Sequence, residues 1–241
     1  MKKKEQGFTL IELMVAMGMA TIVIGIIYSA YNIQTKIYTE QDKVAEMQQN
    51  LRSGLMFLQR EARMAGYNAQ NSSDASCGTS SGKPGIHTAT ATTFGFSMDL
   101  NEDGKCTGPD ENVTYSLYTV DGIKKLGRAA PTVNQPIAEN VEQINFVYIF
   151  SPPLVGSPAT EPPTSSPTAT QLNDIAAVQI SLLARSKTAD QKAVQTVSFS
   201  LPRPNAWGTN SSGGTAWGPY TDSYNRRLLT TTVNCRNMGL K

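Results

Sequence analysis

Residues 1–31 read MKKKEQGFTLIELMVAMGMATIVIGIIYSAY, a short charged segment followed by a long apolar one. From Phe8 to Tyr31 the only charged residue is Glu12. An apolar run of this length forms a helix that crosses a bilayer, because lipid offers no hydrogen-bond partners to an irregular backbone. Lysines precede the run, and the positive-inside rule keeps that end in the cytoplasm. The sequence therefore predicts a transmembrane helix over residues 8–31.

Two features separate this segment from a secretory signal peptide. A signal peptide is cleaved after its apolar run, at small residues. Here the change from charged to apolar residues, which suggests a cleavage site, lies before the run, at Gly7–Phe8. Glu12 is also unusual, because a carboxylate in a membrane helix is costly and needs a partner. Cleavage after Gly7 explains both features, since the new amine of Phe8 is a positive charge that Glu12 of a neighbouring subunit neutralises. Neutralising both charges in a low dielectric favours docking of the two helices in register.

The Lys-rich leader, Gly7 and the segment FTLIE from Phe8 to Glu12 resemble the type III signal of type IV prepilins and pseudopilins. The resemblance implies removal of residues 1–7 by a prepilin peptidase, N-methylation of Phe8 and a role for Glu12 in assembly. It implies partners in other pilins and minor pilins, reached through the helix, together with the lipid bilayer and an inner-membrane assembly platform. The expected location is the bacterial inner membrane, with a single pass and the head in the periplasm, and then the extracellular pilus.

The helical pattern continues beyond the apolar run. Apolar residues recur every seven positions at Ile37, Val44, Leu51, Leu58 and Ala65. Met47, Gly54, Leu55 and Ala62 lie on the same face, and charged residues occupy many of the other positions. This pattern predicts an amphipathic continuation of the same helix, laid against a globular head. Gly66 is a suitable stop, so residues 32–66 are expected to form the periplasmic part of the helix.

Residues 50–67, NLRSGLMFLQREARMAGY, resemble the PilW-type minor pilins, which carry a similar Arg-rich helix ending in Arg-x-Ala-Gly-Tyr. Within this stretch Glu61 is expected to pair with basic neighbours, as in an ordinary amphipathic helix. Three later segments resemble the head of the same family: IAENVEQINFVYIF, IAAVQISLLARSK and RRLLTTTVNCRN. Because the likeness runs nearly to the end of the chain, a fused enzyme domain is not expected.

Residues 67–241 are predicted to form a globular β-rich head. Alternating apolar and polar residues predict strands near residues 94–98, 113–118, 144–150, 180–182, 197–201 and 229–235. Asp121–Gly122 marks a tight hairpin turn. The fold class is therefore α+β: a type IV pilin-like fold in which a long N-terminal helix, its first half transmembrane, packs on an antiparallel β-sheet head with long loops.

Three stretches are predicted to be loops. Residues 71–92 are rich in Ser, Thr, Gly and Ala, and residues 151–170 are rich in Pro, Ser and Thr, which favours an exposed or extended chain. A further loop over residues 207–220 carries both tryptophans of the protein. These tryptophans either mark a contact surface or fold back on the sheet.

The protein has three cysteines, which do not define a disulfide framework by themselves. Cys77 and Cys106 lie in loop-like sequence on the periplasmic side, where disulfides persist. Cys235 shares a strand face with Leu229 and Val233, as a small core residue would. The prediction is a Cys77–Cys106 disulfide with Cys235 reduced.

Residues 99–110, DLNEDGKCTGPD, resemble the first half of a calcium-binding loop, in which alternate oxygen ligands precede a glycine bend. The expected ligands are Asp99, Asn101, Asp103, the backbone carbonyl of Lys105, and Asp110. Asp110 stands at the position where glutamate is usual, and Glu111 lies one step late. The flanking strands favour a hairpin loop that prefers calcium to magnesium. The alternative is an acidic turn in which Asp and Asn bond their own backbone.

Composition argues against several classes of function. The formal net charge of +2 is accounted for by the three lysines and one glutamate of the leader, so no nucleic-acid partner is inferred from charge. The protein has one histidine, His87, and no Gly-rich phosphate loop. Neither a multi-histidine metal site nor a Ser-His-Asp enzyme is expected, and the predicted role is structural rather than enzymatic.

The favoured function is a minor pilin of a type IV pilus. Such a protein is inserted in the inner membrane as a prepilin and incorporated into the filament, where it initiates or supports pilus assembly. One alternative is a minor pseudopilin of a type II secretion system. Another is a tip adhesin or DNA-uptake pilin, in which scattered basic residues contact an anionic surface: Arg203, Arg226, Arg227, Arg236 and Lys241.

Overall fold

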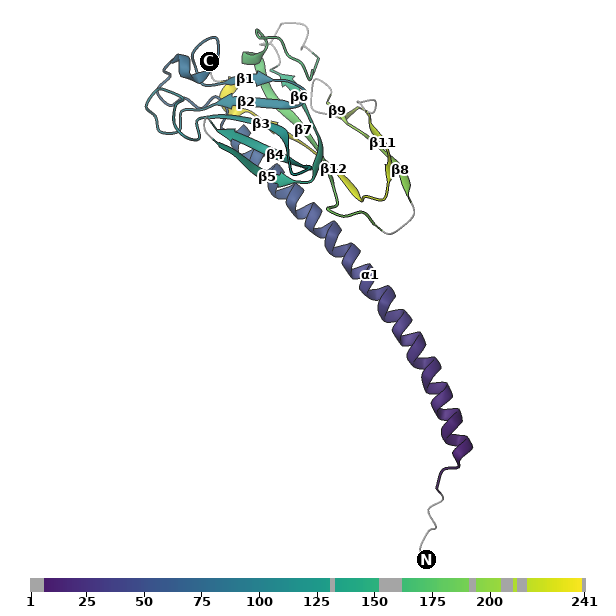
Figure 1. Ribbon diagram of the computed structural model, residues 1–241. Coiled ribbons are helices and arrows are strands. Elements are labelled where there is room, and N and C mark those ends of the chain that lie inside the picture. Colours follow the sequence, from purple (N-terminus) through teal and green to yellow (C-terminus); the bar gives the residue numbers. More distant parts are fainter. Residues whose placement is uncertain are drawn as a thin grey trace, which may run out of the picture. The chain divides into compact units, whose positions relative to one another are not determined.

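The computed structural model describes residues 7–130, 133–151, 162–190, 194–204, 210–211 and 216–239. The chain divides into two compact units, Met1–Ala45 and Glu46–Lys241, and each is described by itself. A single helix, α1 (Leu10–Ala62), supplies the described helical residues of the first unit and continues into the second (Figure 1).

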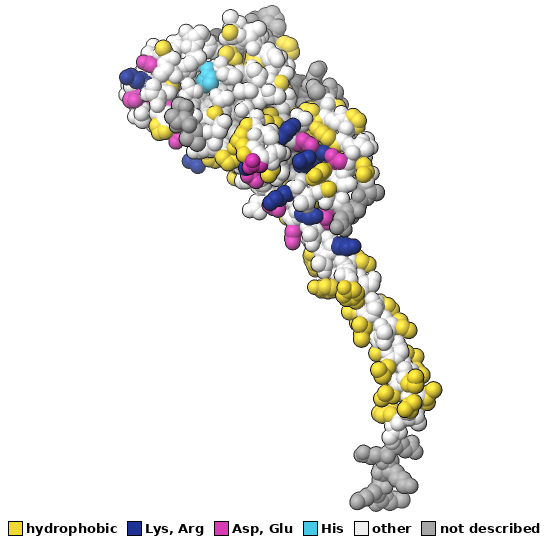
Figure 2. Space-filling view, in the orientation of Figure 1, with side chains coloured by type: hydrophobic (Ala, Val, Ile, Leu, Met, Phe, Trp, Pro, Cys, Tyr) yellow, Lys and Arg dark blue, Asp and Glu magenta, His cyan; other side chains and the backbone are white. Residues whose placement is uncertain are grey.

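In the first unit the side chains of α1 are exposed from Leu10 to Thr39. An 18-residue window of α1 has a mean hydropathy of 2.4, so this helix is long and apolar enough, by length and composition, to cross a membrane. Figure 2 shows many hydrophobic side chains along this part of α1, with uncharged surface between them. The helix predicted from the apolar run is therefore present, and its surface has the composition that lipid requires.

The C-terminal end of α1 is shorter than the sequence suggests. The helix ends at Ala62, and residues 63–66 form a turn instead of the predicted last helical turn. Bonds from the Met64 and Ala65 amides to carbonyls three residues earlier tighten this turn. Gly66 then takes a left-handed conformation, with φ of +79°, and its amide donates to the Ser97 carbonyl at 3.0 Å. The helix stops early because Met64 and Ala65 bond back over three residues and Gly66 bonds a carbonyl outside the helix.

A five-stranded antiparallel sheet follows α1 in the order β1-β2-β3-β4-β5. Its strands are β1 (Ile86–Ala89), β2 (Thr93–Ser97), β3 (Asn112–Val120), β4 (Ile123–Ala130) and β5 (Val133–Glu139). The predicted turn at Asp121–Gly122 joins β3 to β4, and both residues have positive φ, 51° and 75°. This geometry fits a type I′ hairpin turn, whose twist matches that of the flanking strands.

A second, three-stranded antiparallel sheet has the order β12-β7-β6. It is formed by β6 (Val141–Phe150), β7 (Ile175–Arg185) and β12 (Arg226–Asn234). Two smaller antiparallel pairs join β8 (Gln195–Ser200) to β11 (Ala216–Asp222), and β9 (Arg203–Pro204) to β10 (Asn210–Ser211). Short 3-10 helices span Ala75–Cys77, Leu172–Asp174 and Arg236–Gly239.

The core of the head lies between the last turns of α1 and the two larger sheets. The helix contributes one buried face, made of Met47, Leu51, Gly54, Leu55, Leu58 and Ala62. Gly54 permits the closest approach, since a Cβ there would lie 2.8 Å from the Cβ of Ala138 on β5. Gln59 donates a hydrogen bond to the hydroxyl of Thr231 on β12. The end of α1 therefore contacts edge strands of both sheets.

In the five-stranded sheet the prediction missed the two edge strands, β1 and β5, which lack a clear apolar alternation. The four residues of β1 fall inside the predicted loop 71–92, and β1 pairs with β2 alone. Strand β5 includes Pro136, which has no backbone N–H to donate. An edge strand tolerates proline because the groups on its outer side have no neighbouring strand to pair with. Both segments become strands through pairing with a neighbour that has the stronger pattern.

The predicted loop over residues 207–220 is partly a strand. Trp217 belongs to β11, is half-buried and pairs with Phe199 of β8. This position agrees with the interpretation in which a tryptophan folds back on a sheet. Trp207, and residues 152–161 of the Pro/Ser/Thr-rich stretch, lie outside the described residues.

Candidate functional site

The predicted cleavage site precedes the start of α1. Gly7, Phe8 and Thr9 are not helical, and Phe8 is 89% exposed. No other described part of the chain comes within 4 Å of a Cβ placed on Gly7. The bond between Gly7 and Phe8 is therefore presented in an accessible, non-helical segment, as a peptidase substrate requires.

Glu12 and Thr9 form a capping box at the first turn of α1. The Glu12 Oε2 atom accepts the Thr9 backbone N–H at 3.0 Å and the Thr9 hydroxyl at 2.8 Å. The Glu12 amide donates in return to the Thr9 hydroxyl oxygen at 3.4 Å. These bonds satisfy amide donors that the start of a helix otherwise leaves unpaired. The Thr-x-x-Glu spacing of a capping box is visible in the sequence, and Glu12 therefore caps its own helix in addition to its predicted role in assembly.

Arg128 of β4 forms the main polar contact between α1 and the head. Its Nε atom lies 3.0 and 2.9 Å from the two carboxylate oxygens of Glu61 on α1, and its Nη1 atom lies 2.9 Å from Oδ1 of Asp110. The Tyr115 hydroxyl donates to the same Glu61 carboxylate. Burial, with a smaller effect of Glu61, raises the pKa of Tyr115 far above its usual range. Tyr115 therefore remains a hydrogen-bond donor.

This buried cluster corrects the expectation that Glu61 pairs along the helix. Its partner Arg128 is 67 residues away in sequence and only 2% exposed. A buried guanidinium needs its charge matched and its donors bound, and Glu61, Asp110 and Tyr115 together provide this environment. Helical spacing alone gives no signal for a partner on a distant strand.

Cys77 and Cys106 are joined by a disulfide, with their Cα atoms 4.8 Å apart. The bond closes a loop with a sequence separation of 29 residues, which in the chain-entropy description stabilises the fold by about 3.5 kcal/mol. Cys235 is a free cysteine and is buried. Burial raises the pKa of its thiol to about 12, so it remains protonated and unreactive.

The acidic segment predicted as a calcium loop connects β2 to β3. Asp99 is fully buried, and its Oδ2 atom accepts the Gly104 N–H at 3.0 Å. Asn101 Oδ1 accepts the Asp103 N–H at 2.9 Å, and Asp103 Oδ1 accepts the Lys105 N–H at 2.8 Å. The three side chains thus all bond the backbone of the loop itself, as in the alternative of an acidic turn.

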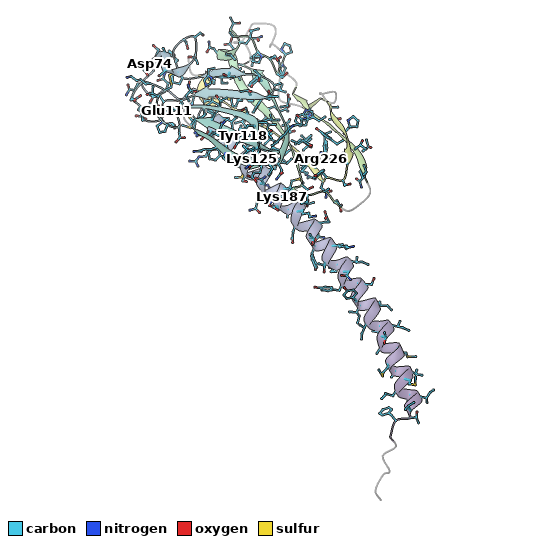
Figure 3. All side chains as sticks on the ribbon, in the orientation of Figure 1. Asp74, Glu111, Tyr118, Lys125, Lys187 and Arg226 are labelled. Atoms are coloured by element: carbon cyan, nitrogen blue, oxygen red, sulfur yellow. A yellow bond between two sulfur atoms is a disulfide. The ribbon has the colours of Figure 1, made fainter. Side chains whose placement is uncertain are left out.

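Asp110 is placed differently from the prediction. It pairs with Arg128, and its side chain is 60% exposed. Glu111, labelled in Figure 3, bonds the backbone of the loop instead. Its Oε1 atom accepts the Leu100 and Asn101 amides at 3.1 Å each, and its Oε2 atom accepts the Gly108 amide at 2.6 Å. Among the described residues no three His, Cys, Asp or Glu side chains are arranged to hold a metal. The predicted convergence of Asp99, Asp103 and Asp110 is therefore wrong, because Arg128 draws Asp110 away.

Comparison with known proteins gives the class and the family. Residues 2–28 match the prokaryotic N-terminal methylation motif, and this match includes the first part of the exposed apolar helix α1. This motif, the long helix and the antiparallel β-sheet head define a type IV pilin-like subunit. Residues 107–237, more than half of the chain, match type IV pilus-assembly protein W. The chain belongs to this PilW family.

Other comparisons add little to this assignment. A type IV-like pilin from Thermus thermophilus is similar in structure, with a TM-score of 0.44 and 14% sequence identity over 79% of this chain and 96% of that one. No curated protein matches the sequence. The family match confirms the predicted PilW resemblance and favours a type IV pilus over a type II secretion system.

Proposed function

We propose that the protein is made as an inner-membrane prepilin, cleaved after Gly7, methylated at Phe8 and incorporated into a type IV pilus as a minor pilin. The observation that carries the proposal is the exposed, non-helical Gly7–Phe8 bond directly before a capped apolar helix. The PilW match of the head supports a role in initiating or supporting assembly.

The proposed orientation follows from charge and composition. Lysines lie before the apolar part of α1, and charged residues become frequent after Thr35. Under the positive-inside rule the leader stays in the cytoplasm and α1 crosses the inner membrane once. The head is then periplasmic, where the Cys77–Cys106 disulfide is stable. After assembly the head becomes part of the extracellular filament.

The proposed partners are a prepilin peptidase, the inner-membrane assembly platform, and other pilins and minor pilins that dock along α1. The docking contact is between Glu12 and the Phe8 amine of a neighbouring subunit. Thr9 bonds only Oε2 of Glu12 among the contacts described, which leaves Oε1 to the incoming amine. Pairing two charges in lipid, where each alone is costly, favours side-by-side association.

The test is mass analysis of the N-terminus of the native protein, taken from membranes and from sheared filaments. The expected N-terminus is methylated Phe8 in both fractions, and the full leader should persist in cells that lack the peptidase. Immunogold labelling of the head should then place the protein on pili. A mature chain that starts at Met1, or beyond Tyr31, would overturn the proposal.

A further inference from the structure

Asp99 has an unusual environment for a carboxylate. The residue is fully buried, and its Oδ1 atom has no hydrogen-bond partner among the described residues. A buried carboxylate oxygen that has lost water without gaining a donor or cation is destabilising. The other oxygen, Oδ2, accepts the Gly104 amide, so the carboxylate faces the loop formed by residues 99–104.

Other oxygen atoms belong to the same loop. Asn101 Oδ1 and Asp103 Oδ1 each accept one backbone amide and retain a further lone pair. The side chains of these two residues are in contact, since Asn101 Nδ2 lies 3.2 Å from Asp103 Oδ2. The side-chain groups bonded within this loop are therefore carboxylate and amide groups, whose oxygens suit a hard cation.

We propose that the loop over residues 99–105 binds a calcium ion. The ligands are the side-chain oxygens of Asp99, Asn101 and Asp103, with the Lys105 carbonyl and water completing the shell. Asp110 is not a ligand, because it pairs with Arg128. Calcium accepts six to eight oxygens in a flexible arrangement, whereas magnesium demands a near-ideal octahedron, so a loop with two carboxylates and an amide favours calcium.

The loop is held in place by contacts outside these ligands. Glu111 accepts the Leu100 amide inside the loop and the Gly108 amide just beyond it, and the Ser72 hydroxyl donates to the Gly104 carbonyl at 3.1 Å. The Tyr67 hydroxyl donates to Glu102 at 3.0 Å. The disulfide at Cys106 follows directly after Lys105. A loop restrained in this way loses little entropy when it binds an ion.

The test uses the full-length protein in detergent, with calcium titration calorimetry and thermal unfolding in calcium or chelator. The expected dissociation constant is about 10⁻⁴–10⁻³ M, the range of extracellular modules. Calcium should raise the melting temperature by a few degrees, because it binds the folded state. Magnesium at the same concentration should produce a smaller rise.

Two variants and a control decide whether the loop is responsible. Asp99→Asn keeps an oxygen acceptor for the Gly104 amide but removes the charge, and should weaken calcium binding at least about tenfold. Asp103→Asn tests the same point at an exposed residue, where failure to fold is not expected. The control is Asp121→Asn in the exposed β3–β4 turn, where asparagine tolerates the positive φ. Its calcium affinity should equal that of the native protein.

Either of two results would overturn the proposal. One is a native protein whose heat of mixing and melting temperature do not respond to calcium up to about 10⁻² M, above the range of extracellular sites. The other is native affinity in both Asp99→Asn and Asp103→Asn. Neither result bears on cleavage after Gly7, so the proposed pilin function is tested separately.

Discussion

Glu12 has two roles: it caps its own helix, and it is proposed to pair with the Phe8 amine of a neighbouring subunit. Within one subunit its carboxylate caps α1 through Thr9. Glutamine also serves in a capping box, whereas alanine does not. Substitution by these two residues therefore distinguishes loss of charge from loss of the cap.

Glu12→Gln should be retained in the membrane but incorporated into filaments at a reduced level, because it caps the helix without neutralising the Phe8 amine of a partner. Glu12→Ala should show a similar loss of incorporation, since it lacks the same charge. The measurement is the ratio of sheared-filament protein to membrane protein. Native incorporation of Glu12→Gln would show that the charge is not used in assembly.

Gly7→Val should block removal of the leader without disturbing the fold. No described part of the chain lies within 4 Å of a Cβ at this position, so valine meets no neighbour in the protein itself. Any effect then arises where the peptidase accepts glycine. Intact mass should show the uncleaved chain, and the head should melt at the native temperature. Efficient cleavage of the variant would contradict the assignment of the site.

At the scale of elements, the close approach of α1 to β5 depends on Gly54. A Cβ at this position would lie 2.8 Å from the Ala138 Cβ, so Gly54→Val forces the helix and strand apart. The expected cost is about 1–3 kcal/mol of unfolding free energy, as for other overpacked cores. The control is Ser53→Val, which places the same side chain at the adjacent exposed position of α1. Equal melting temperatures for the two variants would show that the contact is not tight.

The elements also show what the sequence could and could not predict. The apolar run predicted the first half of α1 through its length and composition. The alternation around Phe94 and Phe146 predicted β2 and β6, because burial of one face of a strand imposes a period that the sequence displays. Strands β1 and β5 were missed, since an edge strand needs only one partner. The Glu61–Arg128 pair was missed because its members lie on different elements, 67 residues apart.

The acidic loop between β2 and β3 illustrates the same limit within one segment. Asp110, which was predicted as a ligand, pairs outside the loop, whereas Glu111, one step later in the sequence, bonds the amides of the loop. Side-chain directions in a loop do not repeat at a regular spacing. The sequence therefore does not show which of two adjacent side chains, Asp110 or Glu111, turns inward. Here Arg128 on β4 binds Asp110, and the backbone amides of the loop bind Glu111.

For the whole molecule, the head combines an apolar core with one cross-link. The double variant Cys77→Ala, Cys106→Ala should lose about 2–5 kcal/mol of unfolding free energy, as small secreted domains do when a native disulfide is removed. Denaturant unfolding of the full-length protein in detergent measures this loss. The matched control is Cys235→Ala, which removes a buried thiol but no cross-link and should cost less. A double variant as stable as the native protein would contradict the role of the disulfide.

The Glu61–Arg128 contact also determines how the head would respond to mechanical tension. A pull transmitted along α1 reaches the head through Glu61, and Arg128 passes it to β4, a strand with hydrogen-bonded neighbours on both sides. Tyr115 also bonds Glu61 and would bear part of the same force, and its strand, β3, is likewise an interior strand of the sheet. An edge strand peels away one bond at a time, whereas an interior strand loaded in shear must break two ladders together. The part of a pull that passes through this contact would therefore load interior strands of the sheet and not its edge.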